Sequence, residues 1–471
     1  MDYYLAMDFS KPTKRIIQSI KDKGFNVLRL QTAPEVHLLD ENYTIDPRYI
    51  KAIKEAVVWA MEEHMYVILC GPFSEFLGND LFRKKTEEDV HFSGINVSES
   101  YKNQSEKLIK AVWTQYTAAF NNSYDEHLIF ETLNEPVDNF HEHGWRPKTY
   151  CTDCIEDFEI LNEYNQLIVN TIRASGGNNT NRFIIVEGLA GSAETITTNL
   201  FKLPEDEAND RLIPAYHEYS MAGREDSKLY YTNDIKNNFM ERFNAVDQYY
   251  FEKHIPVYIT EYSLPRVTPI LERIACSKDF MAEVTENSRS CAICLHAEPL
   301  DNDNFGYYDV WNLEWYDTEW IETIIYAAQG QTFPLSDEFL KANEVKVESI
   351  VGKNLLSEPF NTNNWENVYA IKPDILIRSV PAHYKFEFQI EITGSNPILQ
   401  VGFSDIDWNF NDISERSDVT VTGAVKGRNF PVNSETVTIT ISEELAAEFV
   451  AATRIFLKGQ DIIIKSVKVV E

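Results

Sequence analysis

The sequence predicts an α/β protein, a (β/α)8 barrel of the TIM type followed by an all-β, jelly-roll-like sandwich. From residue 11 to about residue 328, short apolar runs alternate with amphipathic segments, which is the pattern of a parallel sheet wrapped by helices. From Val345 onward, apolar and polar residues alternate with period two, as in half-buried strands. Because 471 residues also exceed one hydrophobic core, we predict a barrel domain at 1–330, a linker at 331–344 and a sandwich at 345–471.

Strands of a parallel sheet are buried on both faces and therefore form nearly continuous apolar runs. Seven such runs are present: Asn26–Leu30, Tyr66–Leu69, Leu128–Leu133, Phe183–Val186, Leu212–Tyr216, Pro256–Thr260 and Ser290–Leu295. We expect the eighth strand at Tyr3–Ala6, because an incomplete barrel would leave open sheet edges. Apolar residues recur at three- and four-residue spacing in four predicted helices, Pro47–Glu63, Glu106–Phe120, Asp157–Ala174 and Phe239–Lys253.

The C-terminal part contains five alternating segments, KFEFQIEI, ILQVGF, DVTVTGAV, ETVTITI and DIIIKSVKVV. With one short helical piece near Glu443–Ala452, they predict an antiparallel β-sandwich.

The charge and hydropathy of the chain exclude several partners. A formal net charge of −31 argues against nucleic acid and against an anionic membrane surface. No run approaches the roughly 20 apolar residues that a bilayer crossing needs. The first residues, MDYYLAMDFSKPTKR, contain no apolar signal core, so any export signal has been removed or was never there. We expect a monomer that is secreted or lies at the cell surface.

Two C-x-x-C pairs, Cys151/Cys154 and Cys291/Cys294, together match the ligand count of a four-thiolate zinc site. No knuckle-type glycines flank them, and the second pair lies within a predicted buried strand. A disulfide between Cys151 and Cys154 is the alternative interpretation of the first pair. We predict neither a metal site nor a cofactor.

The catalytic candidates are carboxylates at the ends of two apolar runs. One run ends in Asn134-Glu135-Pro136, and another ends at Glu261. In (β/α)8 barrels the C-terminal ends of the strands carry the catalytic groups. Glycoside hydrolysis needs such a pair, and a separation of about 5–5.5 Å gives retention of anomeric configuration. The alternative is that a strand-end glutamate caps the next helix or pairs with an arginine.

Over roughly residues 10–328 the sequence resembles glycoside hydrolase family 5, the family of endoglucanases, mannanases and their relatives. The resemblance is carried by KDKGFNVLRL around Arg29, by AVWTQYTAAF ahead of the LNEP box, and by AYHEY, which contains His217 and Tyr219. LNEYNQLIVNTIRASGGNN, RFIIVEG and FGYYDVWNLEWY are similar to later family segments and follow in the same order.

The resemblance implies a role for each matching residue. Glu135 would be the acid/base and Glu261 the nucleophile. Asn134 would hold the 2-hydroxyl of the reacting sugar, a contact that strengthens toward the transition state. Arg29 and the hydroxyl of Tyr219 would stabilise the ionised nucleophile.

His217 would order the acid/base or bind the leaving-group side. The alternative is that it is a core histidine whose hydrogen bonds are satisfied.

The sequence departs from the family at strand 3, where Val67–Phe73 lacks the usual His-His, and at strand 8, where no sugar-stacking Trp is present. There His296 or Glu298 would take over a polar contact and Trp311 the stacking.

We therefore predict a retaining endo-β-glycanase that hydrolyses β-1,4-linked plant polysaccharide, with β-glucan of the cellulose type as substrate. Mannanase or xyloglucanase specificity is an alternative, because the sugar-binding subsites are built by loops and the sequence does not predict the structure of those loops. A catalytically weakened glycan-binding barrel is another, supported by the missing His-His and Trp. Two apposed acids argue against it, since their mutual repulsion would destabilise a protein that only binds.

The sandwich is similar to the modules appended to such hydrolases, many of which bind polysaccharide. The candidate stacking residues are Trp365, Tyr369, Trp408 and Phe410. Trp365 and Trp408 could equally belong to the sandwich core, and the Asp405–Asn411 segment could hold calcium.

Overall fold

The computed structural model describes two compact units, and the main boundary between them falls between Leu335 and Ser336. The predicted limits of the linker, 331–344, stay a prediction. The described residues are 2–5, 13–72, 94–221, 231, 233–286, 288–296, 298–299, 305–310, 312–344, 351–371, 385–404, 410–451 and 454–470.

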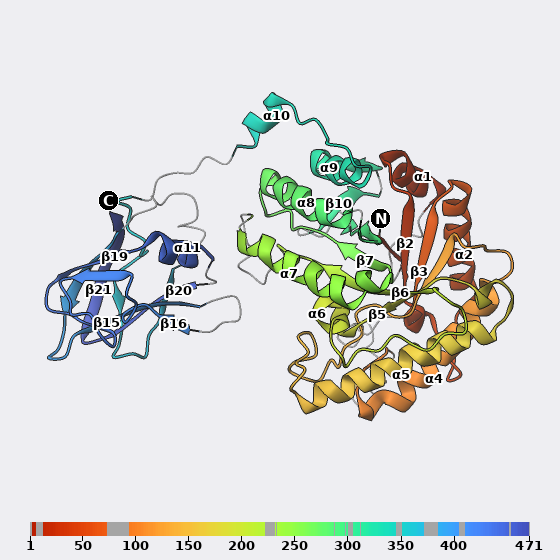
Figure 1. The fold of residues 1–471 in the computed structure, drawn as a ribbon, viewed down its shortest axis with the longest axis horizontal. Coiled ribbons are helices and arrows are strands. Elements are labelled where there is room, and N and C mark those ends of the chain that lie inside the picture. Colours follow the sequence, from red (N-terminus) through yellow and green to blue (C-terminus); the bar gives the residue numbers. More distant parts are fainter. Residues whose placement is uncertain are drawn as a thin grey trace. The chain divides into compact units, whose positions relative to one another are not determined.

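The first unit contains one eight-stranded parallel sheet whose strands pair in chain order, as a (β/α)8 barrel requires (Figure 1). The strands are β1 (Asp2–Leu5), β2 (Val27–Thr32), β3 (Tyr66–Cys70), β4 (Leu128–Glu131), β5 (Ile184–Glu187), β6 (Leu212–Glu218), β7 (Val257–Tyr262) and β8 (Cys291–Leu295). Strand β1 pairs with β2, with Asp2 opposite Arg29. The predicted barrel is confirmed, including a first strand close to the chain start.

Helices connect consecutive barrel strands: α1 (Lys14–Lys23), α2 (Pro47–Glu62), α4 (Glu99–Ala119), α5 (Thr152–Ala174), α6 (Ala193–Ile196), α7 (Asn233–Tyr249) and α8 (Ile270–Val284). Helix α9 (Thr318–Ala328) follows the last barrel strand. Short strands β9 (Glu298–Pro299), β10 (Gly306–Asp309) and β11 (Glu314–Trp315) form a small sheet after β8. Helices α4 and α7 begin earlier than predicted, because their first turns are polar and lack the apolar periodicity that locates a helix.

An apolar layer fills the barrel below the strand ends. Its members, one from each of six strands, are Ile68, Ile129, Ile185, Ala215, Tyr258 and Cys294. Side chains two residues apart on a strand share a face. The next inward position after this layer is therefore occupied by a polar side chain on β3, β4, β5 and β6: Cys70, Glu131, Glu187 and His217. The pleat of the strands thus places a buried polar layer directly above the apolar one.

The second unit is the predicted antiparallel β-sandwich. One sheet has the order β12-β21-β14-β19-β17 and the other β13-β20-β15-β16, with β18 paired to β15. The strands are β12 (Phe360–Asn361), β13 (Tyr369–Ile371), β14 (Lys385–Ile392), β15 (Ile398–Ser404), β16 (Phe410–Asp412), β17 (Val419–Thr422), β18 (Phe430–Pro431), β19 (Thr436–Ile441), β20 (Arg454–Gln460) and β21 (Ile462–Val470).

Two helices belong to this unit, α10 (Asp337–Ala342) within the predicted linker and α11 (Glu443–Ala451) at the predicted helical piece. A single apolar core that includes Phe386, Phe403 and Phe449 lies between the sheets. Among the described helices of the whole chain, none combines the length and the apolar character needed to cross a bilayer.

Candidate active site

Glu135 lies just beyond the end of β4 in a strained backbone conformation, with φ of 43°. Its backbone N–H donates to the Glu187 carboxylate over 2.5 Å. The N–H of Ala190 donates to the carbonyl of Pro136 over 2.9 Å, which ties the loop after β5 to this turn. Left-handed backbone at a residue other than glycine is typical of functional sites held in place by their surroundings.

His217 lies among three carboxylates. Its Nδ1 atom is 2.7 Å from Oε1 of Glu135 and 3.4 Å from Oε2 of Glu261, and its Nε2 atom is 2.7 Å from Oε1 of Glu187. Glu135, His217 and Glu261 each have one side-chain oxygen or nitrogen atom in a group whose members all lie within 4.8 Å of one another. The structure thus brings the two predicted catalytic carboxylates together, although they are far apart in the sequence.

Glu261 accepts hydrogen bonds from three side chains. Arg29 donates from Nη1 over 2.7 Å and Gln31 from Nε2 over 2.6 Å, both to Oε1. Tyr219 donates its hydroxyl to Oε2 over 2.5 Å. Irregular pairing of β6 with β7 sets His217 opposite Glu261 in this region. The carboxylate is therefore fixed in orientation by groups that favour its ionised form.

The guanidinium of Arg29 is fully buried and connects strands β2, β3 and β4. It donates from Nε to Glu131 over 2.6 Å, from Nη2 to Oδ1 of Asn134 over 2.8 Å, and from Nη2 to Sγ of Cys70 over 3.4 Å. Cys70 is the last residue of β3, two positions before Pro72, where the family resemblance leads one to expect the first of two histidines. Arg29 orients Asn134 and Glu261 at the same time.

The two carboxylates have opposite pKa shifts. Burial raises the pKa of Glu135, and the charges of Glu261 and Glu187 add to that increase against the opposing effect of His217. Burial also opposes ionisation of Glu261, but His217 and Arg29 outweigh it and lower the pKa of Glu261 well below its usual range. The surroundings therefore separate the two pKa values, with that of Glu135 above and that of Glu261 below the ordinary glutamate value.

The pKa of His217 is itself strongly raised. Burial disfavours the cation, but the negative charges of Glu261, Glu187 and Glu135 outweigh that effect. A cationic imidazole between the two carboxylates is consistent with the role of ordering Glu135 and argues against a neutral core histidine.

Aromatic rings lie beside Glu261. Tyr219, His296 and Phe305 contact one another, with ring centroids 5.4–6.1 Å apart. Nδ1 of His296 is 4.0 Å from Oε2 of Glu261. The predicted stacking residue Trp311 lies outside the described residues, as do Trp408 and most of Asp405–Asn411.

In the sandwich, Trp365 is half-buried and donates from Nε1 to Gln460 over 2.9 Å. Tyr369 packs against the core, and the exposed ring of Phe410 lies against Phe456. Glycan or calcium binding by this unit stays a prediction.

The sequence interpretation did not single out four residues of the site: Gln31, Glu131, Glu187 and Phe305. A signal was present for Glu187, which ends an apolar strand in RFIIVEG just as Glu261 ends β7. The inward direction of Gln31 and Glu131 can be predicted from strand alternation, because each lies two residues after an inward-facing residue, Arg29 on β2 and Ile129 on β4. Phe305, directly before β10, begins the FGYYDVWNLEWY segment that resembles the family, but that segment alone did not point to a place beside Glu261.

Comparison with known proteins decides the family. The family model described as Cellulase (glycosyl hydrolase family 5) matches residues 4–293. The chain belongs to glycoside hydrolase family 5. It is 32% identical over 313 residues to Endoglucanase 1 of Ruminococcus albus, a match that covers 66% of this chain and 70% of that protein.

Solved structures agree with this assignment. The catalytic domain of CelCCA aligns with a TM-score of 0.60 and 26% identity, covering 69% of this chain and 84% of that one. A broad-specificity family-5 endoglucanase from Ruminococcus champanellensis, with cellotriose bound, aligns with a TM-score of 0.57 and 26% identity over 68% of this chain and 87% of that one. The family-5 protein described here is a glycoside hydrolase.

Proposed function

We propose that this hydrolase is a retaining endo-β-1,4-glucanase that works by double displacement, with Glu135 as acid/base and Glu261 as nucleophile. The observation that carries the proposal is the pair itself, two carboxylates that both contact His217 and whose pKa values are shifted in opposite directions. One oxygen atom of each carboxylate lies within 4.8 Å of the other, which is nearer to the separation of about 5–5.5 Å typical of retaining enzymes than to that of about 6.5–9.5 Å in inverting ones.

In the first step, Glu261 attacks the anomeric carbon while Glu135 gives its proton to the leaving glycosidic oxygen. The C–O bond to the leaving sugar breaks and a covalent glycosyl-enzyme ester forms. In the second step, the ionised Glu135 takes a proton from a water molecule, which attacks the anomeric carbon and releases Glu261. Two inversions leave the β-configuration of the product unchanged.

Arg29 and Asn134 support this sequence of steps. Because Arg29 occupies Oδ1 of Asn134, the amide NH₂ is the group that remains to donate to the sugar 2-hydroxyl. The hydrogen bonds from Arg29, Gln31 and Tyr219 hold Glu261 ionised before the attack and stabilise it again when it leaves. Phe305 and His296 provide the aromatic surface near this end of the site, where the family Trp is missing.

The substrate class rests on the relatives. Two of those named above are endoglucanases, and one of the two holds cellotriose, a β-1,4-glucan fragment. A soluble or insoluble β-glucan is therefore the proposed substrate. Because a polymer of that size does not enter cells, we also propose that the enzyme acts outside the cell or at its surface. The binding-only alternative is less well supported, because mere binding gives no reason for opposite pKa shifts in an apposed pair.

The function is tested by reducing-sugar release from carboxymethyl cellulose, mixed-linkage β-glucan, xyloglucan, mannan and xylan. We expect release from the β-glucans and loss of at least about a hundredfold in Glu135→Gln and Glu261→Gln. Proton NMR of the first product should show the β-anomer before mutarotation. Release from mannan alone would overturn the specificity, and a first-formed α-anomer would overturn double displacement.

A further inference from the structure

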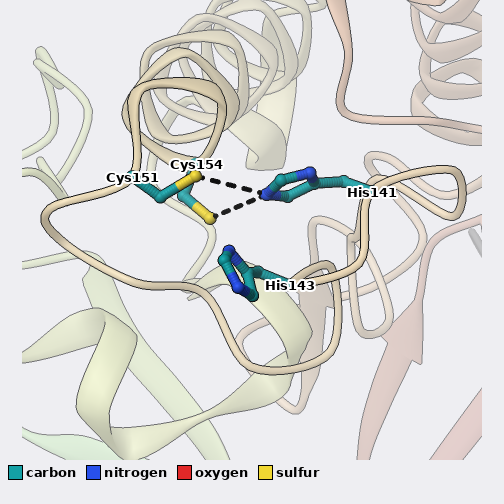
Figure 2. Close-up of side chains that lie close together, drawn as sticks. All are labelled: His141, His143, Cys151 and Cys154. Carbon is teal, nitrogen blue, oxygen red and sulfur yellow. Dashed lines mark hydrogen bonds between the residues drawn. The ribbon is translucent and has the colours of Figure 1, made fainter.

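A second cluster of reactive side chains lies in the segment that leads from the Glu135 turn to helix α5. It consists of His141, His143, Cys151 and Cys154, which Figure 2 shows converging on one point. One ligand atom of each lies within 4.8 Å of the others. Cys154 is buried and the other three side chains are partly buried. The catalytic mechanism uses none of these residues.

Both sulfur atoms approach the same ring nitrogen. Nε2 of His141 is 3.4 Å from Sγ of Cys151 and 3.3 Å from Sγ of Cys154 (Figure 2). None of the six cysteines, all within the described residues, forms a disulfide. A neutral imidazole nitrogen has one lone pair and accepts one good hydrogen bond, so two thiols directed at it are not explained by hydrogen bonding alone.

The distances match those around a tetrahedral metal ion. Zn–S and Zn–N bonds of about 2.3 Å and 2.0–2.1 Å at tetrahedral angles place neighbouring sulfur and nitrogen ligands about 3.5 Å apart. Two thiols and two imidazoles are the ligand set that zinc prefers in structural sites, whereas magnesium and calcium prefer oxygen.

The remaining ring nitrogens face carboxylates. Nδ1 of His141 is 3.9 Å from Asp153, and Nε2 of His143 is 3.6 Å from Glu142. Metal-binding histidines commonly direct the second ring nitrogen to such a carboxylate. Nδ1 of His143 is buried and has no hydrogen-bond partner among the described residues. This pattern assigns Nε2 of His141 and Nδ1 of His143 as the metal-binding atoms.

We propose that Cys151, Cys154, His141 and His143 bind a structural Zn²⁺ ion. The proposal differs from our sequence-based expectation of no metal, which considered the two C-x-x-C pairs together and overlooked the H-x-H upstream of the first. The second pair is not involved, since Cys294 belongs to the apolar layer inside the barrel.

The ion would cross-link the loop after β4 to the start of α5. The backbone hydrogen bonds within this loop include short-range turns, such as Gly144 N–H to the His141 carbonyl at 3.0 Å and Cys151 N–H to the Lys148 carbonyl at 3.1 Å. Cys151 is the N-cap residue of α5 and makes no side-chain capping hydrogen bond. Because the loop continues directly from Glu135 and Pro136, zinc would fix the segment that leaves the acid/base.

Metal content tests the proposal directly. The full chain, purified under reducing conditions without a metal-binding tag and dialysed, should contain about one zinc ion per molecule. Cys151→Ser, Cys154→Ser and His143→Ala should each lose most of it. Cys291→Ser and His127→Ala, which remove a cysteine and a histidine outside the cluster, should keep it. Cobalt substitution should give sulfur-to-metal charge-transfer absorption in the wild type that the Cys151→Ser variant lacks.

Stability provides a readout that does not depend on catalysis. Chelation should lower the melting temperature of the wild type by several degrees and leave that of Cys151→Ser unchanged, because that variant has no zinc to lose. Absence of zinc after growth and reconstitution with zinc would overturn the proposal. Equal zinc content in the cluster variants and the two control variants would overturn it as well.

Discussion

Nε2 of His217 lies 2.7 Å from Oε1 of Glu187, and this contact joins β5 to β6 directly beside the catalytic pair. Glu187 is fully buried and also accepts the backbone N–H of Glu135. One carboxylate thus positions the acid/base through its backbone and through its histidine neighbour.

Replacing Glu187 by Gln should test this positioning role. The amide keeps the size of the side chain but removes a charge that raises the pKa of His217, so that pKa should fall. We expect kcat/KM to drop by about 10- to 100-fold. NMR titration of the histidine and steady-state kinetics measure the two effects. Glu218→Gln, which removes another buried carboxylate paired with Arg242, should leave kcat/KM close to that of the wild type.

The pH profile should be bell-shaped, with limits set by the coupled carboxylate pair. Because the pKa of Glu261 is lowered, activity should persist as the pH falls below the ordinary glutamate range and be lost only when Glu261 is protonated. Because the pKa of Glu135 is raised, the alkaline limb should lie above that range. An acidic limb at or above the ordinary glutamate pKa of about 4.3 would contradict this assignment.

Tyr219→Phe should shift only the acidic limb of the pH profile. The hydroxyl helps to lower the pKa of Glu261, so its removal should shift the acidic limb of kcat/KM to higher pH and reduce kcat about tenfold or more. Tyr216→Phe is the matched control, since that buried hydroxyl has no hydrogen-bond partner among the described residues. A shift of the alkaline limb in Tyr219→Phe would argue against the assigned partner.

Gly191→Ala should disturb the catalytic site by contact. A Cβ atom there would lie 3.0 Å from Glu187 Oε1, 3.1 Å from His217 Nδ1 and 3.2 Å from Glu135 Cγ. We expect kcat to fall at least about tenfold, together with a loss of about 1–2 kcal/mol of stability from the left-handed backbone. Gly330→Ala introduces the same backbone strain with no atom within 4 Å, so it should lose stability but keep its activity.

Glu131→Gln should separate stability from catalysis. It breaks a fully buried ion pair with Arg29 and should lower the unfolding free energy by about 3–5 kcal/mol. Asp206→Asn breaks the well-buried Arg173 pair and should have a comparable effect on stability. Only Glu131→Gln should reduce kcat, because Arg29 also holds Glu261 and Asn134. Equal kcat in the two variants, measured below the melting temperature, would count against that role.

Strand periodicity explains how much of the site the sequence could predict. Glu135 and Glu261 were found because each ends an apolar run at the rim where barrel enzymes carry their catalytic groups. The same rule points to Glu187. Glu131 was missed because it was treated as part of an apolar run, although its side chain faces Arg29 inside the barrel.

Contacts between distant segments were harder to predict. The position of His217 among three carboxylates depends on the irregular pairing of β6 with β7, which leaves no sequence signal. The grouping of His141 and His143 with Cys151 and Cys154 depends on turns within an irregular loop. Local patterns define elements and their inward faces, but they do not define which loop side chains meet.

The most direct test of the double-displacement account is azide rescue of Glu261→Ala and Glu135→Ala with an activated aryl β-cellobioside, followed by NMR of the glycosyl azide. In Glu261→Ala, azide should attack from the vacated nucleophile side and give the α-azide. In Glu135→Ala, it should attack the glycosyl-enzyme from the acid/base side and give the β-azide. The same anomer from both variants, or the reverse assignment, would contradict the proposed roles.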